Sequence, residues 1–480
     1  MEEKRIISLK GIIGYASALY FVGLFSSFIS FGVTLMLIKV ITKEALGKLG
    51  FFVAFYTLGN SILSFGMERT IVKYVGEGRI HKAKIIKIIF LLTGIISIFT
   101  ILGGIMIYSF NKLWAFSLLM ITPCLFCSFS VSIFRGEFAR NKEIKFNLVC
   151  SLLNSGITLI LLLFFKNELA PILGQIFSYY ICAIFLLFYL LSKSKEDDRC
   201  SINTPDWSWI KEMAKFSFPL WIAILCATAN RTADKFILQG FLGFSLLGEY
   251  YLSQQFFQFI DKPIANLSQA LLGGLSISGI KSLSTYQRLI SFNLVLFPSV
   301  ALLTTGILPV LLKILNKDFP CVAPIFALLS VCFVAKSIEV VNTVSTIVKN
   351  YPQANQNTHL ITFLINIPTL LILVSCFGIY GAGFGVITFW FLYIFIHMHF
   401  MKKILPEYVS LGLRMCIKAL LFYLLALSLI FKIGGIAIIP LGIAVYLFGS
   451  HWIGIWSYLE LKAMMEELFK RKSLTKAEQI

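Results

Sequence analysis

Long apolar runs separated by short polar segments make up most of the chain. A helix that crosses a bilayer needs about 20 mainly apolar residues. The runs are continuous instead of alternating between apolar and polar positions, which favours membrane helices over membrane strands. We therefore predict an all-α fold, a polytopic membrane protein with about 14 transmembrane helices. The predicted spans are Ile12–Ile38, Leu46–Phe65, Ile85–Tyr108, Leu113–Phe134, Phe146–Phe165, Leu169–Leu191, Phe216–Phe241, Leu246–Leu275, Leu289–Leu312, Pro320–Val348, Leu360–Phe377, Gly381–Met401, Met415–Phe431 and Ile436–Leu459.

The composition supports a membrane protein. Of the 480 residues, 58% are hydrophobic and 14% are charged, and the mean hydropathy is +0.86. An ordinary soluble domain is about 45–50% apolar and about 25% charged. A soluble fold of this composition could not cover its surface with polar groups, so cytosolic enzymes, secreted domains and disordered chains are excluded.

The net charge of +19 comes from 42 Lys and Arg residues against 23 Asp and Glu. With alternating spans and an inner N-terminus, 29 of these cations belong to inner segments and 8 to outer segments, when Lys87 and Lys48 near span ends are counted with the adjoining segments. The other five lie within or at the ends of spans, at Arg231, Lys235, Lys262, Lys336 and Lys418. Because Lys and Arg concentrate in cytoplasmic loops, we predict that both termini are cytoplasmic. This distribution accounts for the positive charge, and no nucleic-acid partner is expected.

The segments between the spans carry no recognisable catalytic machinery. The longest polar stretches, 192–215 and 460–480, are too short to fold as domains. The sequence has no P-loop, H-E-x-x-H or G-x-S-x-G motif. Cys124 and Cys127 form a C-x-x-C, but they lie in an apolar run without a second ligand pair, so no metal or other cofactor is predicted. Transport is favoured over catalysis, and we predict that the protein is not an enzyme.

A weak internal repeat relates the two halves of the chain. After a shift of 201 residues, Leu46 and Gly47 fall on Leu247 and Gly248, and Phe55 falls on Phe256. A shift of six spans preserves orientation, so the repeat is parallel, with its axis along the membrane normal. We predict two six-helix lobes that face a central cavity lined by spans one, two, seven and eight. The predicted organisation is an N-lobe (1–191), a cytoplasmic linker (192–215), a C-lobe (216–401), a terminal helix pair (402–459) and a cytoplasmic tail (460–480).

Three stretches resemble Wzx-type polysaccharide flippases of the multidrug/oligosaccharidyl-lipid/polysaccharide exporter superfamily. They are LIKVITKEALGKLGFFVAFYTLGNSILSFGMERTIVKYVGEG at 37–78, FRGEFARNKEIKFNLV at 134–149 and ANRTADKFILQGFLGFSLLGEYYLSQQF at 229–256. The resemblance implies alternating access in the bacterial cytoplasmic membrane. It implies as cargo an undecaprenyl-diphosphate-linked oligosaccharide repeat unit, moved to the outer leaflet for the synthesis of a surface polysaccharide such as O-antigen. It further implies membrane lipids, a polysaccharide polymerase and a chain-length regulator as partners.

Two other members of the superfamily are alternatives. Drug extruders often carry an acidic cation site in the N-lobe, and the lipid II flippase carries essential arginines in its first span. The first predicted span here has no charged residue. Fourteen spans is, however, more typical of the lipid II flippase. We rank a polysaccharide flippase first, another lipid-carrier flippase of the lipid II type second, and a cation-coupled multidrug antiporter third.

The candidate substrate-binding residues are charged side chains within spans, because such residues are costly in a bilayer and face a cavity or one another. They are Arg231, Asp234, Lys235, Lys262 and Lys336. Arg231, Asp234 and Lys235 share one helix face by their spacing, as do Lys336 and Glu339. One interpretation is that Arg231–Asp234 and Lys336–Glu339 are local ion pairs. The other is that Arg231, with Lys235 or Lys262, binds a diphosphate, since the guanidinium fork suits phosphate oxygens.

Overall fold

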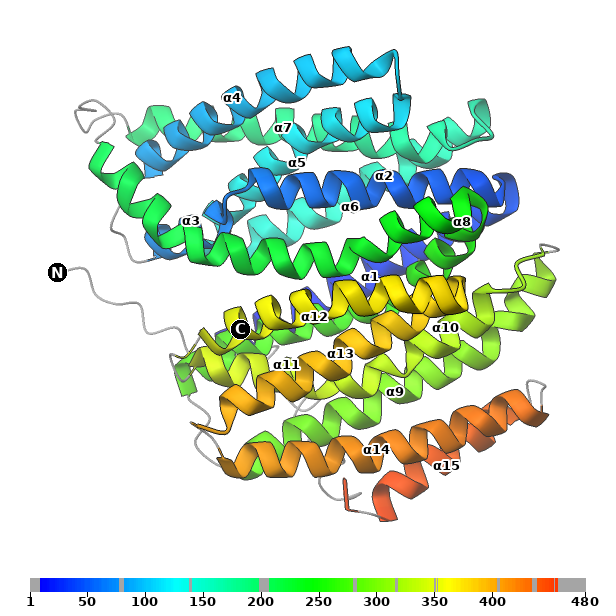
Figure 1. Ribbon diagram of the computed structural model, residues 1–480. Coiled ribbons are helices and arrows are strands. Elements are labelled where there is room, and N and C mark those ends of the chain that lie inside the picture. Colours follow the sequence, from blue (N-terminus) through cyan, green and yellow to red (C-terminus); the bar gives the residue numbers. More distant parts are fainter. Residues whose placement is uncertain are drawn as a thin grey trace, which may run out of the picture. The chain divides into compact units, whose positions relative to one another are not determined.

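The computed structural model describes residues 9–76, 82–137, 140–197, 207–278, 283–315, 318–348, 351, 353–403, 406–433, 438–452 and 454–455. All regular structure in these ranges is helical (Figure 1), which confirms the predicted all-α class. The helices are α1 Leu9–Val40, α2 Lys43–Leu63, α3 Met67–Gly76, α4 Lys82–Tyr108, α5 Lys112–Gly136, α6 Arg140–Phe164, α7 Leu169–Asp197, α8 Trp207–Ser278, α9 Leu283–Ile314, α10 Val322–Ser330, α11 Cys332–Val348, α12 Gln353–Phe377, α13 Ile379–Met401, α14 Pro406–Ile433 and α15 Ile438–Trp452.

The chain is a multi-pass membrane protein. Within the described residues, 10 helices are long and apolar enough to cross a membrane, or up to 11 if a bent pair counts as one span. Two shorter apolar helices, Phe25–Val40 and Ile439–Trp452, lie in predicted spans. The 72-residue α8 contains two predicted spans, and its helical geometry breaks at Gly243, where φ is 77°. The prediction of fourteen crossings stays a prediction.

The helix α3 lies in a segment that the hydrophobic pattern assigned to a loop. The turn before it places Phe65 at φ 47° and Gly66 at φ 68°, in the left-handed region. A Cβ atom at Gly66 would lie 2.7 Å from the backbone oxygen of Ser217, so this corner needs glycine. On α3, Met67, Ile71 and Tyr74 are buried in a hydrophobic cluster. The loop is therefore in part a short helix that packs one face on the protein.

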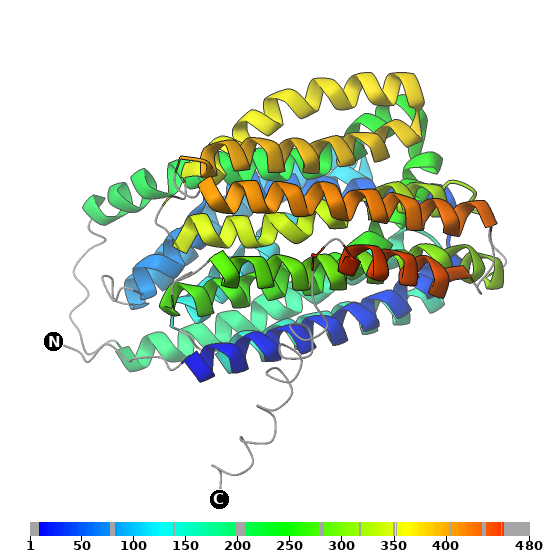
Figure 2. The same ribbon diagram turned by 90° about the horizontal axis from the view of Figure 1, so that it is seen from below.

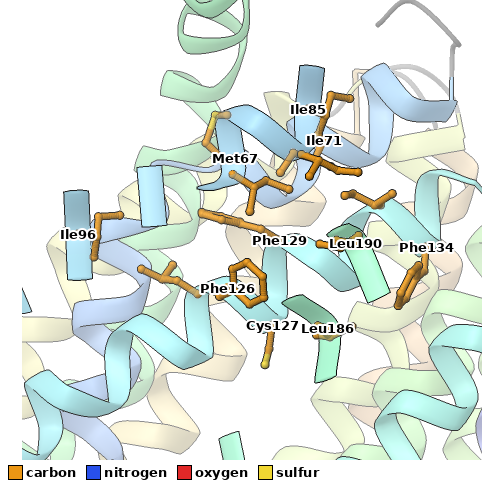
Figure 3. Packing of buried hydrophobic residues seen from close by; sticks show 14 of the residues in the cluster. Met67, Ile71, Ile85, Ile96, Phe126, Cys127, Phe129, Phe134, Leu186 and Leu190 are labelled. Carbon is orange, nitrogen blue, oxygen red and sulfur yellow. The ribbon is translucent and has the colours of Figure 1, made fainter. Parts of the chain in front are cut away.

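One compact unit, which we call the N-terminal unit, comprises Gly14–Pro263 and Asn355–Gly385. Its central helix is α5, which packs against α2, α3, α4, α6 and α7. Figure 3 shows the core between these helices, where Ile71, Ile85, Phe129 and Leu186 meet from α3, α4, α5 and α7. The outer faces of α4, α6 and α7 expose large apolar side chains, as a lipid-facing surface does.

The second compact unit, the C-terminal unit, comprises Met1–Ile13, Ile264–Ala354 and Val386–Ile480. Its central helix is α9, which packs against α10, α11, α14 and α15. The helices α14 and α15, orange and red in Figure 2, also pack against each other. Buried hydroxyls join these helices, because Tyr446 donates to the backbone oxygen of Leu294 at 2.5 Å and Ser291 donates to that of Ile455.

The two compact units are defined by how densely the residues pack. The predicted lobes are defined instead by the internal repeat of the sequence. The chain passes from the N-terminal to the C-terminal unit after Pro263, inside α8. The lobe boundaries at 191 and 216 stay a prediction. The predicted tail 460–480 lies outside the described residues.

Candidate functional site: a buried polar cluster on α8 and a close crossing of α2 and α8

The reversal of α8 at Gly243 brings its two arms together around Asp234. The carboxylate oxygen Oδ2 accepts hydrogen bonds from Tyr250 Oη at 2.5 Å and Gln254 Nε2 at 2.6 Å. The other oxygen, Oδ1, accepts from the backbone amide of Lys235 at 2.8 Å and lies 3.4 Å from Lys235 Nζ. A carboxylate has about four acceptor sites, so these four donors nearly saturate Asp234. This side chain therefore fastens the two arms of α8 together.

The interpretation of Arg231 and Asp234 as a local ion pair, one of the two left open by the sequence, is wrong. The ion pair of Asp234 is with Lys235, and both side chains are at least 94% buried. Lys235 Nζ also donates to the backbone oxygen of Arg231 at 3.1 Å. Arg231 itself is exposed, one helical turn before Lys235. The two cations that the spacing placed on one face therefore have different surroundings: one is buried and neutralised, and the other is exposed.

The remaining predicted site residues are divided between the two compact units. Lys262 is an exposed residue near the end of the N-terminal unit. Lys336 belongs to the C-terminal unit, where it is buried with its Nζ 4.6 Å from the centre of the Trp390 ring. A cation over an indole face is a favourable electrostatic contact. The carboxylate of Glu339 accepts a hydrogen bond from Thr343 at 3.0 Å.

Uncharged polar residues extend the Asp234 cluster. Asn230, one turn before Asp234, accepts a hydrogen bond at 3.3 Å from Asn366 on α12. Three buried atoms, Asn230 Nδ2, Asn366 Oδ1 and Gln254 Oε1, have no hydrogen-bond partner within the described structure. Buried polar atoms are rarely left in this state, so they offer hydrogen bonds to water or a polar ligand. These amides are uncharged, so a selection of charged residues within the spans misses them, although Asn366 interrupts an apolar run.

The helices α2 and α8 cross in direct backbone contact. A Cβ atom at Gly47 would lie 1.9 Å from the backbone oxygen of Phe244, and one at Gly248 would lie 1.9 Å from that of Lys43. The residues in these two contacts are related by the same shift of 201 positions, so the crossing is symmetric in the predicted repeat. The Leu-Gly repeat in the sequence indicated these positions, but not that they touch.

A charged pair lies beside this crossing. Lys43 Nζ is 2.9 Å from Glu249 Oε1, and the glutamate side chain is 3% exposed while the lysine is 31% exposed. The rings of Phe28 and Phe31 on α1 also pack on Phe259 of α8, with centroids 5.4 and 4.9 Å apart. The helices α1 and α2 therefore each contact the second arm of α8, and the cavity between the predicted lobes stays a prediction.

The residues that the structure describes give no evidence of a metal site. No group of three or more His, Cys, Asp or Glu side chains there could hold a metal ion. Cys127 is buried in the α5 core, and Cys124 is partly buried.

Comparisons with known proteins identify a sequence family and a shared fold. The family model described as "Polysaccharide biosynthesis protein" matches residues 11–272. No curated protein sequence matches the chain significantly.

The solved structures that share the fold of this chain include the following three. An inward closed lipid II flippase, MurJ, is 15% identical with a TM-score of 0.68, and the match covers 91% of this chain and 98% of that one. An outward-facing multidrug resistance transporter of the MATE family is 13% identical (TM-score 0.61; 84% and 97%). A MOP superfamily transporter from Pyrococcus furiosus is 14% identical (TM-score 0.61; 84% and 97%).

At these identities the structures show the fold alone, which is that of MOP superfamily transporters. The family model, by contrast, matches the sequence itself, and it covers more than half of the chain, from α1 into the second arm of α8. This multi-pass membrane chain therefore belongs to the polysaccharide biosynthesis protein family.

Proposed function

We propose that the protein is a flippase that moves polyprenyl-diphosphate-linked oligosaccharide repeat units to the outer leaflet of the bacterial cytoplasmic membrane. The observation that carries the proposal is the family match over residues 11–272 in a chain with a transporter fold. In the proposed topology the chain crosses the membrane fourteen times and has both termini in the cytoplasm. The asymmetry of Lys and Arg residues supports this orientation. A polysaccharide polymerase and a chain-length regulator are the proposed partners.

The symmetric crossing of α2 and α8 supports alternating access. In the proposed topology, Gly47 and Gly248 lie at the outer ends of spans two and eight, which belong to different predicted lobes. Their direct contact closes the outer side, and cargo release to the outer leaflet requires it to separate. Glycines on both sides allow close approach without interlocking side chains. The Lys43–Glu249 ion pair, in which the lysine is partly exposed, stabilises this contact between α2 and α8 electrostatically.

The proposed diphosphate ligand is bound by Arg231, together with Lys262. Both side chains are exposed, and no carboxylate pairs with the Arg231 guanidinium among the described residues. The buried Lys235–Asp234 pair positions the helix that carries Arg231, because Lys235 bonds the Arg231 backbone oxygen. The amides of Asn230 and Asn366 are available for cargo hydroxyls. Lys336 is the remaining candidate residue for binding the cargo.

Deletion of the gene in its host tests the cargo. The expected result is loss of surface polysaccharide and accumulation of its lipid-linked repeat unit on the inner leaflet. Accumulation of lipid II, with surface polysaccharide intact, would instead assign the protein to the second candidate, a lipid II-type flippase. That candidate is favoured by the match to MurJ, which covers 91% of this chain. A normal lipid profile with increased drug sensitivity would favour the antiporter.

Variants of Arg231 test the ligand contact. Loss of a charge-assisted hydrogen bond to phosphate costs about 1.5–3 kcal/mol, or roughly 10- to 150-fold in binding. Arg231→Ala should reduce export by that order at unchanged protein level, and Arg231→Lys should restore it in part. The double change Arg231→Ala with Asp234→Ala should not restore export, because it also leaves the buried Lys235 without its carboxylate. Recovery by the double change would remove Arg231 from the site.

A reversible crosslink tests alternating access. In a background with the ten native cysteines replaced, a reducible bifunctional thiol reagent long enough to replace the two side chains should crosslink Lys43→Cys with Glu249→Cys and stop export until it is reduced. The matched control is Lys48→Cys with Glu168→Cys, which joins a 3.2 Å pair inside the predicted N-lobe. This control should crosslink without loss of export. Full export by the crosslinked 43–249 protein would exclude opening at this crossing.

A further inference from the structure

An apolar pocket of about 350 Å³ lies in the N-terminal unit, away from the Asp234 cluster. It is enclosed by the α2–α3 corner, the first half of α4 and the first arm of α8. Its inner wall contains the buried side chains of Met67, Ile96 and Phe129, which belong to the core shown in Figure 3. The pocket is therefore an indentation in a packed core.

The mouth of this pocket is apolar. Phe65, Leu91, Ile95 and Phe218 line it and are 46–57% exposed. In a membrane protein, exposed side chains of this kind face hydrocarbon. The mouth therefore opens to the lipid, and the natural occupant is a hydrocarbon chain.

The polar groups in the lining are already satisfied. Ser64 Oγ donates to the backbone oxygen of Ser61 at 3.2 Å, and Ser217 Oγ donates to that of Ala214 at 3.2 Å. Trp221 Nε1 donates to the backbone oxygens of Ser61 at 3.1 Å and Ile62 at 3.0 Å. The side-chain donors of the wall are thus already used, which leaves apolar contact as the main means of recognition.

Cations lie at one end of the pocket. Lys87 is one turn before the lining residue Leu91 on α4, and Lys211 is one turn before Lys215 and Ala214 on α8. All three lysines are exposed. Both helices begin at this end of the pocket, which the Lys and Arg distribution predicts to be cytoplasmic. A lipid phosphate bound by these lysines would lie next to the end of an acyl chain that occupies the pocket.

Two neighbouring carboxylates, Glu212 and Glu68, interact with groups other than these lysines. Glu212 accepts a hydrogen bond from Tyr74 at 3.0 Å. Glu68 is half-buried at the start of α3. Burial raises the pKa of its carboxyl, while Arg135 and a hydrogen bond with Ser128 act in the opposite direction. Both acids are thus engaged with their own neighbours.

We propose that this pocket binds one acyl chain of an anionic phospholipid of the surrounding membrane, with the phosphate held by Lys87, Lys211 and Lys215. Basic pockets between membrane helices at the cytoplasmic side bind anionic headgroups. Phospholipid is the medium around the mouth, so mass action favours it over rarer lipids. The bound lipid contacts both α4 and α8, since both helices line the pocket. This proposal does not depend on the transported cargo.

Native mass spectrometry of the purified full-length protein tests the site, with phosphatidylglycerol and phosphatidylcholine as probes. One phosphatidylglycerol should remain bound preferentially. Ala214→Trp fills the pocket from an exposed position and should abolish this binding. Lys87→Gln with Lys211→Gln should weaken phosphatidylglycerol binding about 30-fold, at about fivefold per Lys near a membrane surface, and should change phosphatidylcholine binding less, because its choline cation offsets its phosphate.

A matched control keeps the loss of two positive charges but moves it elsewhere. Lys112→Gln with Lys166→Gln changes two exposed lysines in predicted outer segments and should leave phosphatidylglycerol binding unchanged. Equal binding of the two phospholipids by the unchanged protein, or retained binding by a folded Ala214→Trp variant, would overturn the proposal. Displacement of phosphatidylglycerol by an equimolar polyprenyl phosphate would also overturn it, because the pocket would then belong to the carrier lipid.

Discussion

The two ends of α2 contact α8 in different ways. At its first end, Gly47 meets the α8 backbone directly, and Lys43 pairs with Glu249. At its last end, Ser61 donates to Thr228 at 2.8 Å, and Trp221 donates to two α2 backbone oxygens. The first end has charge and backbone contact, whereas the last end has neutral hydrogen bonds and an apolar pocket beside it.

The internal repeat explains the difference. When two repeat-related helices cross on their axis, equivalent residues meet and the same contact occurs twice, as at an isologous interface. Gly47 on Phe244 and Gly248 on Lys43 are such a pair of contacts. At the last end α2 meets the early part of α8, which is not its repeat equivalent, so the packing there is irregular. The symmetric, tight contact at the first end of α2 is suited to opening and closing. The irregular packing at the last end leaves space for a ligand.

The largest expected effect is at the glycine crossing. Gly47→Ala or Gly248→Ala places a methyl group against a backbone oxygen that cannot rotate away. Each should destabilise the protein by about 3 kcal/mol, measured as a lowered thermal unfolding midpoint in detergent. Gly94→Ala is the control, because a Cβ atom there meets nothing within 4 Å. An unchanged midpoint for Gly47→Ala would mean that the helices are not in direct contact.

The ion pair at the same end should have the next largest effect. Lys43→Met leaves the buried Glu249 carboxylate without this ammonium, and should cost about 2 kcal/mol. Adding Glu249→Met should recover most of the loss, since the buried carboxylate that lost this ammonium is then removed. The control is Lys48→Met, whose partners Glu44 and Glu168 are more exposed and whose loss should cost about 0.5 kcal/mol. If both lysine variants behaved alike, the pair beside Gly47 would be an ordinary surface pair.

At the last end of α2, Trp221→Phe should cost about 1 kcal/mol. The change keeps an aromatic ring beside Phe65 but removes the donor to Ser61 and Ile62. Trp114→Phe is the comparison, because the described contacts of this indole are with the rings of Phe51 and Phe55. Unfolding midpoints in detergent should therefore fall more for position 221. Equal shifts would show that the indole donor contributes nothing.

The smallest effect is expected for Ser61→Ala, which removes a hydroxyl–hydroxyl bond to Thr228. About 0.5 kcal/mol is typical for such a neutral bond. A double-mutant cycle with Thr228→Val measures the coupling. A coupling as large as that of Lys43 with Glu249 would contradict the contrast between the two ends of α2.

The sequence determined that this is a helical membrane protein and where its helices run. Lipid requires every backbone polar group to bond within its own segment, so apolar length and continuity suffice to predict helices. The sequence also indicated Gly47 and Gly248, because their Leu-Gly pairs repeat after 201 residues. It did not indicate α3, since a 10-residue helix lacks a span-length apolar run.

The partners of charged groups were decided by the tertiary structure. Spacing along one helix placed Arg231 beside Asp234, but Tyr250 and Gln254 reach Asp234 from the other arm of α8 because the chain reverses at Gly243. In the same way Glu249 lies 206 positions from Lys43. Helices in lipid are apolar on all faces, so the sequence does not mark which face a neighbour covers. Burial, pairing and pocket therefore depend on how distant helices pack, which a hydrophobic pattern does not encode.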